Sequence, residues 1–172
     1  MAGPPTDEDA EMTAPNPAGR DRDERGRPRN ARDRDALGRP LPRGVAGLPP
    51  LPDDLRLPPA ETLAEAHRLL ATGRPFQAHE VLEAAWKCAP AEHRPLWQGL
   101  AQLAVGITHA ARGNRRGAAR LLRRGGDRLA GCAADLPCGL DAAALAGWVA
   151  EALNRVEAVA GPVELAPPPL PH

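Results

Sequence analysis

Apolar residues recur every three to four positions between residues 59 and 160, and this spacing predicts amphipathic helices. Pro59 and Pro75 suit the first turn of a helix, whereas Asn114 and Asp141 suit the position just before one. Five helices are predicted: from Pro59 to Gly73, from Pro75 to about Cys88, from about Pro95 to Gly113, from Asn114 through Leu129, and from Asp141 to about Val159. Without any strand-like alternation, the short connections predict an all-α fold, a compact antiparallel bundle of about five helices.

The segments on either side of this region have a different composition. Residues 1–58 are rich in proline, arginine and aspartate, lack aromatic residues and alternate in charge, as in residues 20–25. Such a segment cannot bury enough apolar area to offset the entropy of ordering it. We therefore expect three parts: a disordered arm over residues 1–58, a helical domain over residues 59–160 and a Pro-rich C-terminal tail over residues 161–172. The end of the arm is expected to lie extended against the domain.

Charge and cysteine usage narrow the class of protein. The 22 basic and 22 acidic residues cancel, so the whole chain has no field that would attract polyanions. Three cysteines at irregular spacings argue against a disulfide framework and indicate a reducing compartment. The N-terminus lacks a secretory pattern, and the longest charge-free stretch, residues 95–111, is shorter than a membrane span. We expect a cytoplasmic protein that does not enter a membrane.

The helix predicted from Pro95 to Gly113 is the centre of the domain. It has no charged residue between residues 95 and 111, whereas a surface helix would carry charges on its outer face. That face instead carries three uncharged polar residues, which are Gln98, Gln102 and His109. Gly99 and Gly106 permit close approach of a neighbouring helix. We therefore expect the helix to be covered on most sides, with partners for its polar groups, because an unsatisfied buried polar group costs about 1–3 kcal/mol.

The helix over residues 75–88 carries a polar stripe at the spacing that an apolar stripe would normally have. Its members are Phe76, His79, Glu80, Glu83 and Trp86. The other side of the same helix is also apolar, so the helix is expected to pack on two sides with its stripe partly enclosed. Pairing of the stripe with Gln98, Gln102 and His109 would give a buried polar network that fixes the register of the two helices.

Two motifs resemble the signature of the domain-of-unknown-function family DUF309. One is residues 76–86, FQAHEVLEAAW, and the other is residues 98–104, QGLAQLA, followed by a histidine and by Gly-Asn and Gly-Ala pairs. The resemblance covers roughly residues 60–130. It implies a compact all-helical fold and bacterial, archaeal or plastid-type relatives, and it implies no established activity. The family pattern carries over onto Phe76, His79, Glu80, Glu83, Trp86, Gln98, Gln102, His109 and Asn114.

The first functional hypothesis is binding or scaffolding without catalysis. Antiparallel helices often form grooves for peptides or partner helices, and Phe76 or Trp86 beside charged groups would be a suitable anchor. Gln98, Gln102 and His109 are the other candidate binding residues. The partner would be a protein or a small molecule, and a homodimer is a further possibility because a core of this size has a modest stability margin.

The second hypothesis is a hydrolytic site, metal-dependent or acid–base. His79 and Glu83 share a helix face at i, i+4, Glu80 could act as a base, and His109 could supply a third ligand. The motif lacks the second histidine of a zincin, and the nearby glutamines are poor zinc ligands. The sequence therefore predicts no cofactor, keeps a divalent metal as the alternative, and leaves open whether the chain is an enzyme.

Nucleic-acid binding is the third hypothesis. Seven arginines crowd residues 112–128 against one acid, Asp127, and such a stripe could contact phosphates. A charge run on the outer face of an amphipathic helix is more often solvated surface, so this hypothesis ranks below the other two.

Overall fold

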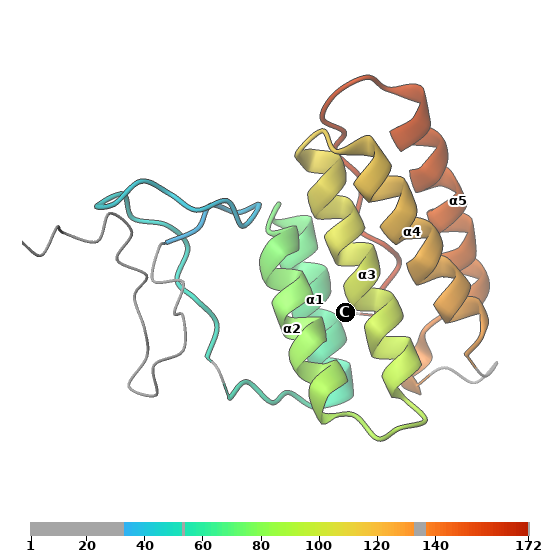
Figure 1. Cartoon of the computed structure of the whole chain (residues 1–172). Coiled ribbons are helices and arrows are strands. Elements are labelled where there is room, and N and C mark those ends of the chain that lie inside the picture. Colours follow the sequence, from blue (N-terminus) through green and yellow to red (C-terminus); the bar gives the residue numbers. More distant parts are fainter. Residues whose placement is uncertain (1–32, 53, 133–136, 172) are drawn as a thin grey trace, which may run out of the picture. The chain divides into compact units, whose positions relative to one another are not determined.

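The computed structural model describes residues 33–52, 54–132 and 137–171, and these form an all-helical unit (Figure 1). Its elements are α1 (Pro59–Ala71), α2 (Pro75–Cys88), α3 (Arg94–Ala111), α4 (Arg115–Ala130), a short 3-10 helix η1 (Pro137–Gly139) and α5 (Ala142–Ala158). The predicted all-α fold is confirmed, with two isolated bridges and no strand among the described residues. The first 32 residues of the predicted arm lie outside the described residues.

The helix boundaries follow the capping residues that the sequence offers. Asn114 precedes α4 and its Oδ1 accepts a hydrogen bond from the backbone N–H of Gly117 at 2.9 Å. Asp141 precedes α5 and its carboxylate accepts from two backbone N–H groups of the first turn. Both predicted N-caps are thus confirmed. No described helix combines the length and the apolar character that a membrane crossing requires.

The helices pack in chain order, each against the next, so that α3 lies between α2 and α4 (Figure 1). Eleven residues of α3 are buried, from Leu96 to Ala110, and they surround most of the helix. This confirms that α3 is covered on most sides. The most deeply buried side chains come from all five helices, so the core runs through the whole bundle; they include Leu63, Leu82, Leu103, Leu122 and Leu145.

Glycines set the close contact between α3 and α4. A Cβ atom built on Gly99 would lie 2.9 Å from Leu129 Cγ, and one on Gly106 would lie 2.9 Å from Leu122 Cγ. On α4, a Cβ atom at Gly125 would lie 2.9 Å from the carbonyl oxygen of Gly99. Real Cβ atoms do not approach other atoms so closely, so the two helices can adopt this spacing only with glycine. The expectation for Gly99 and Gly106 is confirmed.

The tail, here residues 161–171, is extended and contributes to the core. The backbone N–H of Val163 donates to the carbonyl of Ala110 at the end of α3, at 2.9 Å. Val163, Leu165 and Leu170 are all buried in the same core cluster as the helices. The tail therefore covers part of the bundle that the five helices leave open. The domain boundary placed at residue 160 stays a prediction, and core packing continues beyond it into the tail.

The arm segment, here residues 33–52, folds into turns and contacts the bundle. The backbone N–H of Leu48 donates to the carbonyl of Arg34 at 3.0 Å, and that of Gly38 donates to Asp35 at 2.8 Å. Asp35 also accepts hydrogen bonds from backbone N–H groups through its carboxylate. These bonds hold the arm segment in one shape, which the composition of residues 1–58 did not lead us to expect.

Candidate functional site

The stripe lies on one side of α2, and its five residues are all half-buried. The opposite side of α2 carries Ala78, Val81 and Leu82, which are buried against the rest of the bundle. The helix therefore has an inner apolar face and an outer face that is neither fully covered nor fully exposed. Side chains in this position can be reached from outside while still being held in place by their neighbours.

The arm segment lies against the first residue of the stripe. The guanidinium carbon of Arg34 lies 5.4 Å from the centroid of the Phe76 ring, within the range of a cation–π interaction. Arg34 Nη1 also donates to the carbonyl of Gly38 at 2.6 Å. Gly38 has φ of +75°, and a Cβ atom there would overlap the ring of Phe76. The ring is thus in contact with a cation and with a stretch of backbone that only glycine can form.

Glu80 lies one turn further along α2, near enough for its charge to act on Arg34. Burial raises the pKa of the Glu80 carboxyl, and the attraction of Arg34 opposes this rise. The carboxylate and the ring of Phe76 therefore act on the same guanidinium. Below, "the arginine seat" means Phe76 and Glu80.

The middle of the stripe is an ion-pair group at the surface. Lys87 Nζ lies 3.1 Å from Glu83 Oε1, and His79 Nε2 lies 3.7 Å from Glu83 Oε2. Burial lowers the pKa of His79, and the neighbouring Glu83 carboxylate only partly offsets this. The rings of His79 and Phe76 are in tilted contact, with their centroids 6.2 Å apart. His79 is therefore favoured in its neutral form, between an aromatic ring and an engaged carboxylate.

Two side chains outside the stripe hold the arm segment by its backbone. Gln77 is only 5% exposed, and its Nε2 donates to the carbonyl of Pro49 at 2.9 Å. Arg112, at the end of α3, donates through Nη2 to the carbonyl of Leu37. The signal for Gln77 was present in the sequence, because it is a polar residue on the apolar side of its helix. Nothing in the pattern marked Arg112 apart from the other arginines.

The polar residues of α3 do not pair with the stripe. His109 Nδ1 lies 2.8 Å from Asn114 Nδ2, in the connection to α4, and Gln98 and Gln102 are half-buried. The side-chain oxygen of Gln102 is buried without a hydrogen-bond partner. Within the described ranges, no hydrogen bond joins the stripe to any of these three residues. The expected hydrogen-bonded network between the two helices is therefore not formed there.

Metal ligation requires several donors close together, and the described residues bring only some of the candidates into contact. His79 and Glu83 approach each other, whereas His109 is engaged by Asn114. Over residues 33–52, 54–132 and 137–171, no group of three or more His, Cys, Asp or Glu side chains is placed to hold a metal ion. The three cysteines are all free thiols.

The arginines of α4 gather on its outer face. An open hollow is lined there by four arginines and Asp127. Two arginines of this helix tie it to α5: Arg115 Nε donates to the carbonyl of Val156 at 3.0 Å, and Arg123, which also lines the hollow, pairs with the carboxylate of Glu157. Some of the α4 arginines thus stabilise the packing of α4 on α5.

Comparison with known proteins relates part of the chain to one protein family. The family described as a domain of unknown function, DUF309, matches residues 63–121, from within α1 to within α4. The resemblance carried by the two motifs is therefore confirmed, and the stripe lies within the matched region. No curated protein and no solved structure matches the chain.

Proposed function

We propose that this chain, whose residues 63–121 match DUF309, is a binding domain that holds arginine-bearing segments on the stripe of α2. The observation that carries the proposal is the seat of Arg34 on Phe76, with the backbone of Gly38 against the same ring. The arm segment occupies this face as a tethered ligand would. A purely structural stripe would be covered by side chains of neighbouring helices instead.

The chemistry of the contacts supports recognition of a segment rather than of one fixed partner. Gln77 and Arg112 donate to backbone carbonyls, which every peptide segment presents. The arginine seat then adds selectivity, because a ring face and a carboxylate together favour a guanidinium. The partner is therefore expected to carry an arginine followed, four residues later, by a glycine that can pass close to Phe76.

A second copy of the chain is one natural source of such a segment, since every copy carries residues 33–52. A segment supplied from outside must compete with the tethered one, whose effective concentration is of the order of millimolar for a short flexible connection. Binding in trans is thus strongest when the tethered segment is released. A variant that releases the tethered segment therefore tests the proposal.

The test uses the full chain with Gly38→Ala, which pushes the tethered segment off Phe76, and Gly44→Ala as its matched control. Both glycines have positive φ, but a Cβ atom at Gly44 meets nothing within 4 Å. Titration of a fluorescent peptide of residues 33–52 should show tighter binding to the Gly38→Ala chain than to the Gly44→Ala chain. Replacing Arg34 by alanine in the peptide should then weaken binding about 2- to 5-fold.

That arginine preference should vanish when Phe76→Ala is added to the Gly38→Ala chain, because the ring is the surface on which the guanidinium lies. Circular dichroism establishes that each variant keeps its helices. A folded Gly38→Ala chain that does not bind the peptide, or binds it equally well with and without its arginine, would contradict the proposal.

A hydrolytic site at His79, Glu80 and Glu83 is the second candidate, and the opposite pKa shifts of two of its members favour it. A lowered His79 pKa supplies a neutral base, and a raised Glu80 pKa keeps a carboxylic acid protonated to higher pH. Untagged protein should then hydrolyse p-nitrophenyl acetate or phosphate, with or without added Zn²⁺ or Mn²⁺, and His79→Ala should abolish the activity. Absence of bound metal together with rates equal to the buffer background would eliminate this candidate.

A further inference from the structure

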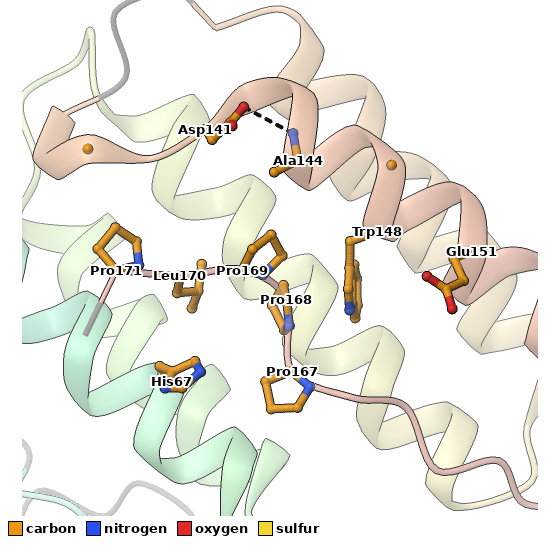
Figure 2. A pocket seen from close by; sticks show the side chains of 12 residues that line it. His67, Asp141, Ala144, Trp148, Glu151, Pro167, Pro168, Pro169, Leu170 and Pro171 are labelled. Atoms are coloured by element: carbon orange, nitrogen blue, oxygen red, sulfur yellow. Dashed lines mark hydrogen bonds between the residues drawn. The ribbon is translucent and has the colours of Figure 1, made fainter.

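The tail crosses the bundle between α1 and α5, in a groove lined by residues of both helices (Figure 2). The two helices have few direct contacts with each other, which leaves room for the tail between them. His67 of α1 lies beside Leu170, and Trp148 of α5 lies beside Pro168. The exposed part of this groove is an open hollow of about 760 Å³ next to the five residues Pro167–Pro171. The prolines differ in exposure, because Pro168 is buried in the groove whereas Pro169 is exposed to solvent.

The tail is held by the two features that a proline-rich segment can offer. Proline has no backbone N–H, so its segments are recognised through carbonyl oxygens and through apolar ring surfaces. Trp148 Nε1 donates to the carbonyl of Ala166 at 3.1 Å, and Arg155 Nη2 donates to the carbonyl of Glu164 at 3.1 Å. Buried Pro168 and Leu170, the latter only 4% exposed, provide the apolar part.

The four residues in the groove occur a second time in the chain. Pro168–Pro171 reads Pro-Pro-Leu-Pro, and residues 49–52 have the same sequence. The second copy is also held against the bundle by a side-chain donor, because Gln77 bonds the carbonyl of Pro49. Its leucine, Leu51, is packed against the core as a partly buried residue. The same tetrapeptide is thus docked twice, each time by a donated hydrogen bond near it and a leucine turned toward the core.

We propose that the groove between α1 and α5 is a recognition site for proline-rich segments that contain Pro-Pro-Leu-Pro, and that the tail is its tethered occupant. The partner is an extended proline-rich segment of another protein chain. This site shares no residue with the arginine seat on α2, so the two proposals stand or fall separately.

The connection between α5 and the tail is suited to exchange. The helix ends at Ala158, and the next residue, Val159, is 44% exposed. Gly161 has φ of +123°, a conformation that few other residues adopt. A short exposed link of this kind lets the tail leave the groove without unwinding α5. The tethered tail nevertheless competes strongly, since a short link gives a high effective concentration.

The experiment weakens the tethered occupant and supplies the same segment from outside. In the full chain, Leu170→Asp removes the buried leucine from the tail and leaves the groove itself unchanged. Calorimetric titration with a synthetic peptide of residues 163–172 should then show binding at least about 10-fold tighter than to the unmodified chain. A peptide of residues 46–54, which carries the other Pro-Pro-Leu-Pro, should bind the same variant.

Peptide variants distinguish specific recognition from non-specific binding. A peptide with Leu170→Asp should not bind, whereas one with Glu164→Ala should bind as well as the unmodified peptide, because Glu164 is exposed and only its carbonyl is used. Adding Trp148→Phe to the Leu170→Asp chain keeps an aromatic ring but removes the donor. That change should weaken binding about 2- to 10-fold.

A folded Leu170→Asp chain that binds neither peptide would overturn the proposal, as would equal binding of the peptide with Leu170→Asp. If only the peptide of residues 163–172 binds, the groove reads more of the tail than Pro-Pro-Leu-Pro, and the proposed motif is wrong. Should Leu170→Asp fail to fold, the unmodified chain gives the answer. Excess peptide must then accelerate hydrogen exchange at the Val163 amide, and an unchanged exchange rate would refute displacement.

Discussion

The guanidinium of Arg34 lies over the ring of Phe76, 5.4 Å from its centroid, and this pair joins the arm segment to α2. Phe76→Leu keeps an apolar side chain but removes the π face, and Arg34→Gln keeps a hydrogen-bond donor but removes the charge. Each change should raise the hydrogen-exchange rate of the Leu41 and Leu48 amides, which are bonded within the arm segment, by about 2- to 5-fold.

The double variant tests whether the two side chains act on each other. If the cation–π contact is what they share, Phe76→Leu combined with Arg34→Gln should exchange little faster than either single variant. Additive effects would mean that the two residues hold the segment independently, and the arginine seat would lose its main support.

The buried histidines should make stability depend on pH near neutrality. Burial lowers the pKa of both His79 and His109, so the unfolded chain takes up protons at a higher pH than the folded chain does. Stability is then lost as the pH falls below about 6.5, the usual imidazole value, and the loss ends at the lowered pKa of the folded state. The melting temperature should decrease between pH 7.5 and 6 by less in His79→Gln, and least in the variant that also carries His109→Gln.

Glu80 contributes with the opposite sign. Its raised pKa means that the folded chain holds a proton which the unfolded chain has already lost, so the burial of this carboxyl costs stability above that pKa. Glu80→Gln should therefore flatten the acidic side of the stability profile and leave the histidine-dependent part in place. A melting temperature that is independent of pH from 7.5 to 6 in the Glu80→Gln variant, where no opposing contribution of this carboxyl remains, would contradict the assignment of the histidines.

Close packing of α3 and α4 predicts unequal effects of the same Gly→Ala change. At Gly125, a Cβ atom would meet the backbone oxygen of Gly99 at 2.9 Å, and backbone cannot move aside easily. We expect Gly125→Ala to destabilise the chain by about 1–3 kcal/mol in urea denaturation. At Gly147, on an exposed part of α5, nothing lies within 4 Å, and alanine should stabilise by about 0.5–1 kcal/mol. Equal midpoints for the two variants would be inconsistent with this packing.

The arginine face of α4 should bind DNA only weakly. Arg116, Arg120 and Arg124 are exposed, but the chain has no net charge. Few phosphate contacts are available, so fluorescence anisotropy with a duplex should show binding that is lost when salt rises from 50 to 200 mM. Sub-micromolar binding that persists at 200 mM salt and disappears in a triple alanine variant of these arginines would instead establish a nucleic-acid interface.

The helices could be predicted because each begins with a residue whose chemistry is specific to that place. Pro75 starts α2, Asn114 and Asp141 cap α4 and α5, and all three acted in the structure as the sequence indicated. The central position of α3 followed from its lack of charge. The burial of Val163 and Leu165 did not follow, because an extended proline-rich segment has no periodicity that shows which surface it will meet.

Only the part of the candidate site that lies on a single helix face could be predicted from the sequence. Helical spacing placed Phe76, His79 and Glu83 side by side, and the structure agrees. Spacing gives directions around one helix and not the identity of the neighbour, which is why His109 was expected to pair with the stripe although it contacts Asn114. The contact of Arg34 with Phe76 joins positions far apart in sequence, and no local sequence pattern indicates it.

The hydrogen bond from Val163 to Ala110 also has a consequence for synthesis of the chain on the ribosome. Residues 163–170 complete the burial around α3, yet they are made after every helix. A nascent chain that has released α1 to α5 still exposes the part of the core against which Val163, Leu165 and Leu170 pack, until this stretch emerges. Translation that stops just before residue 163 would yield a helical product with this part of the core uncovered, and quality control by chaperones and proteases would be expected to remove it.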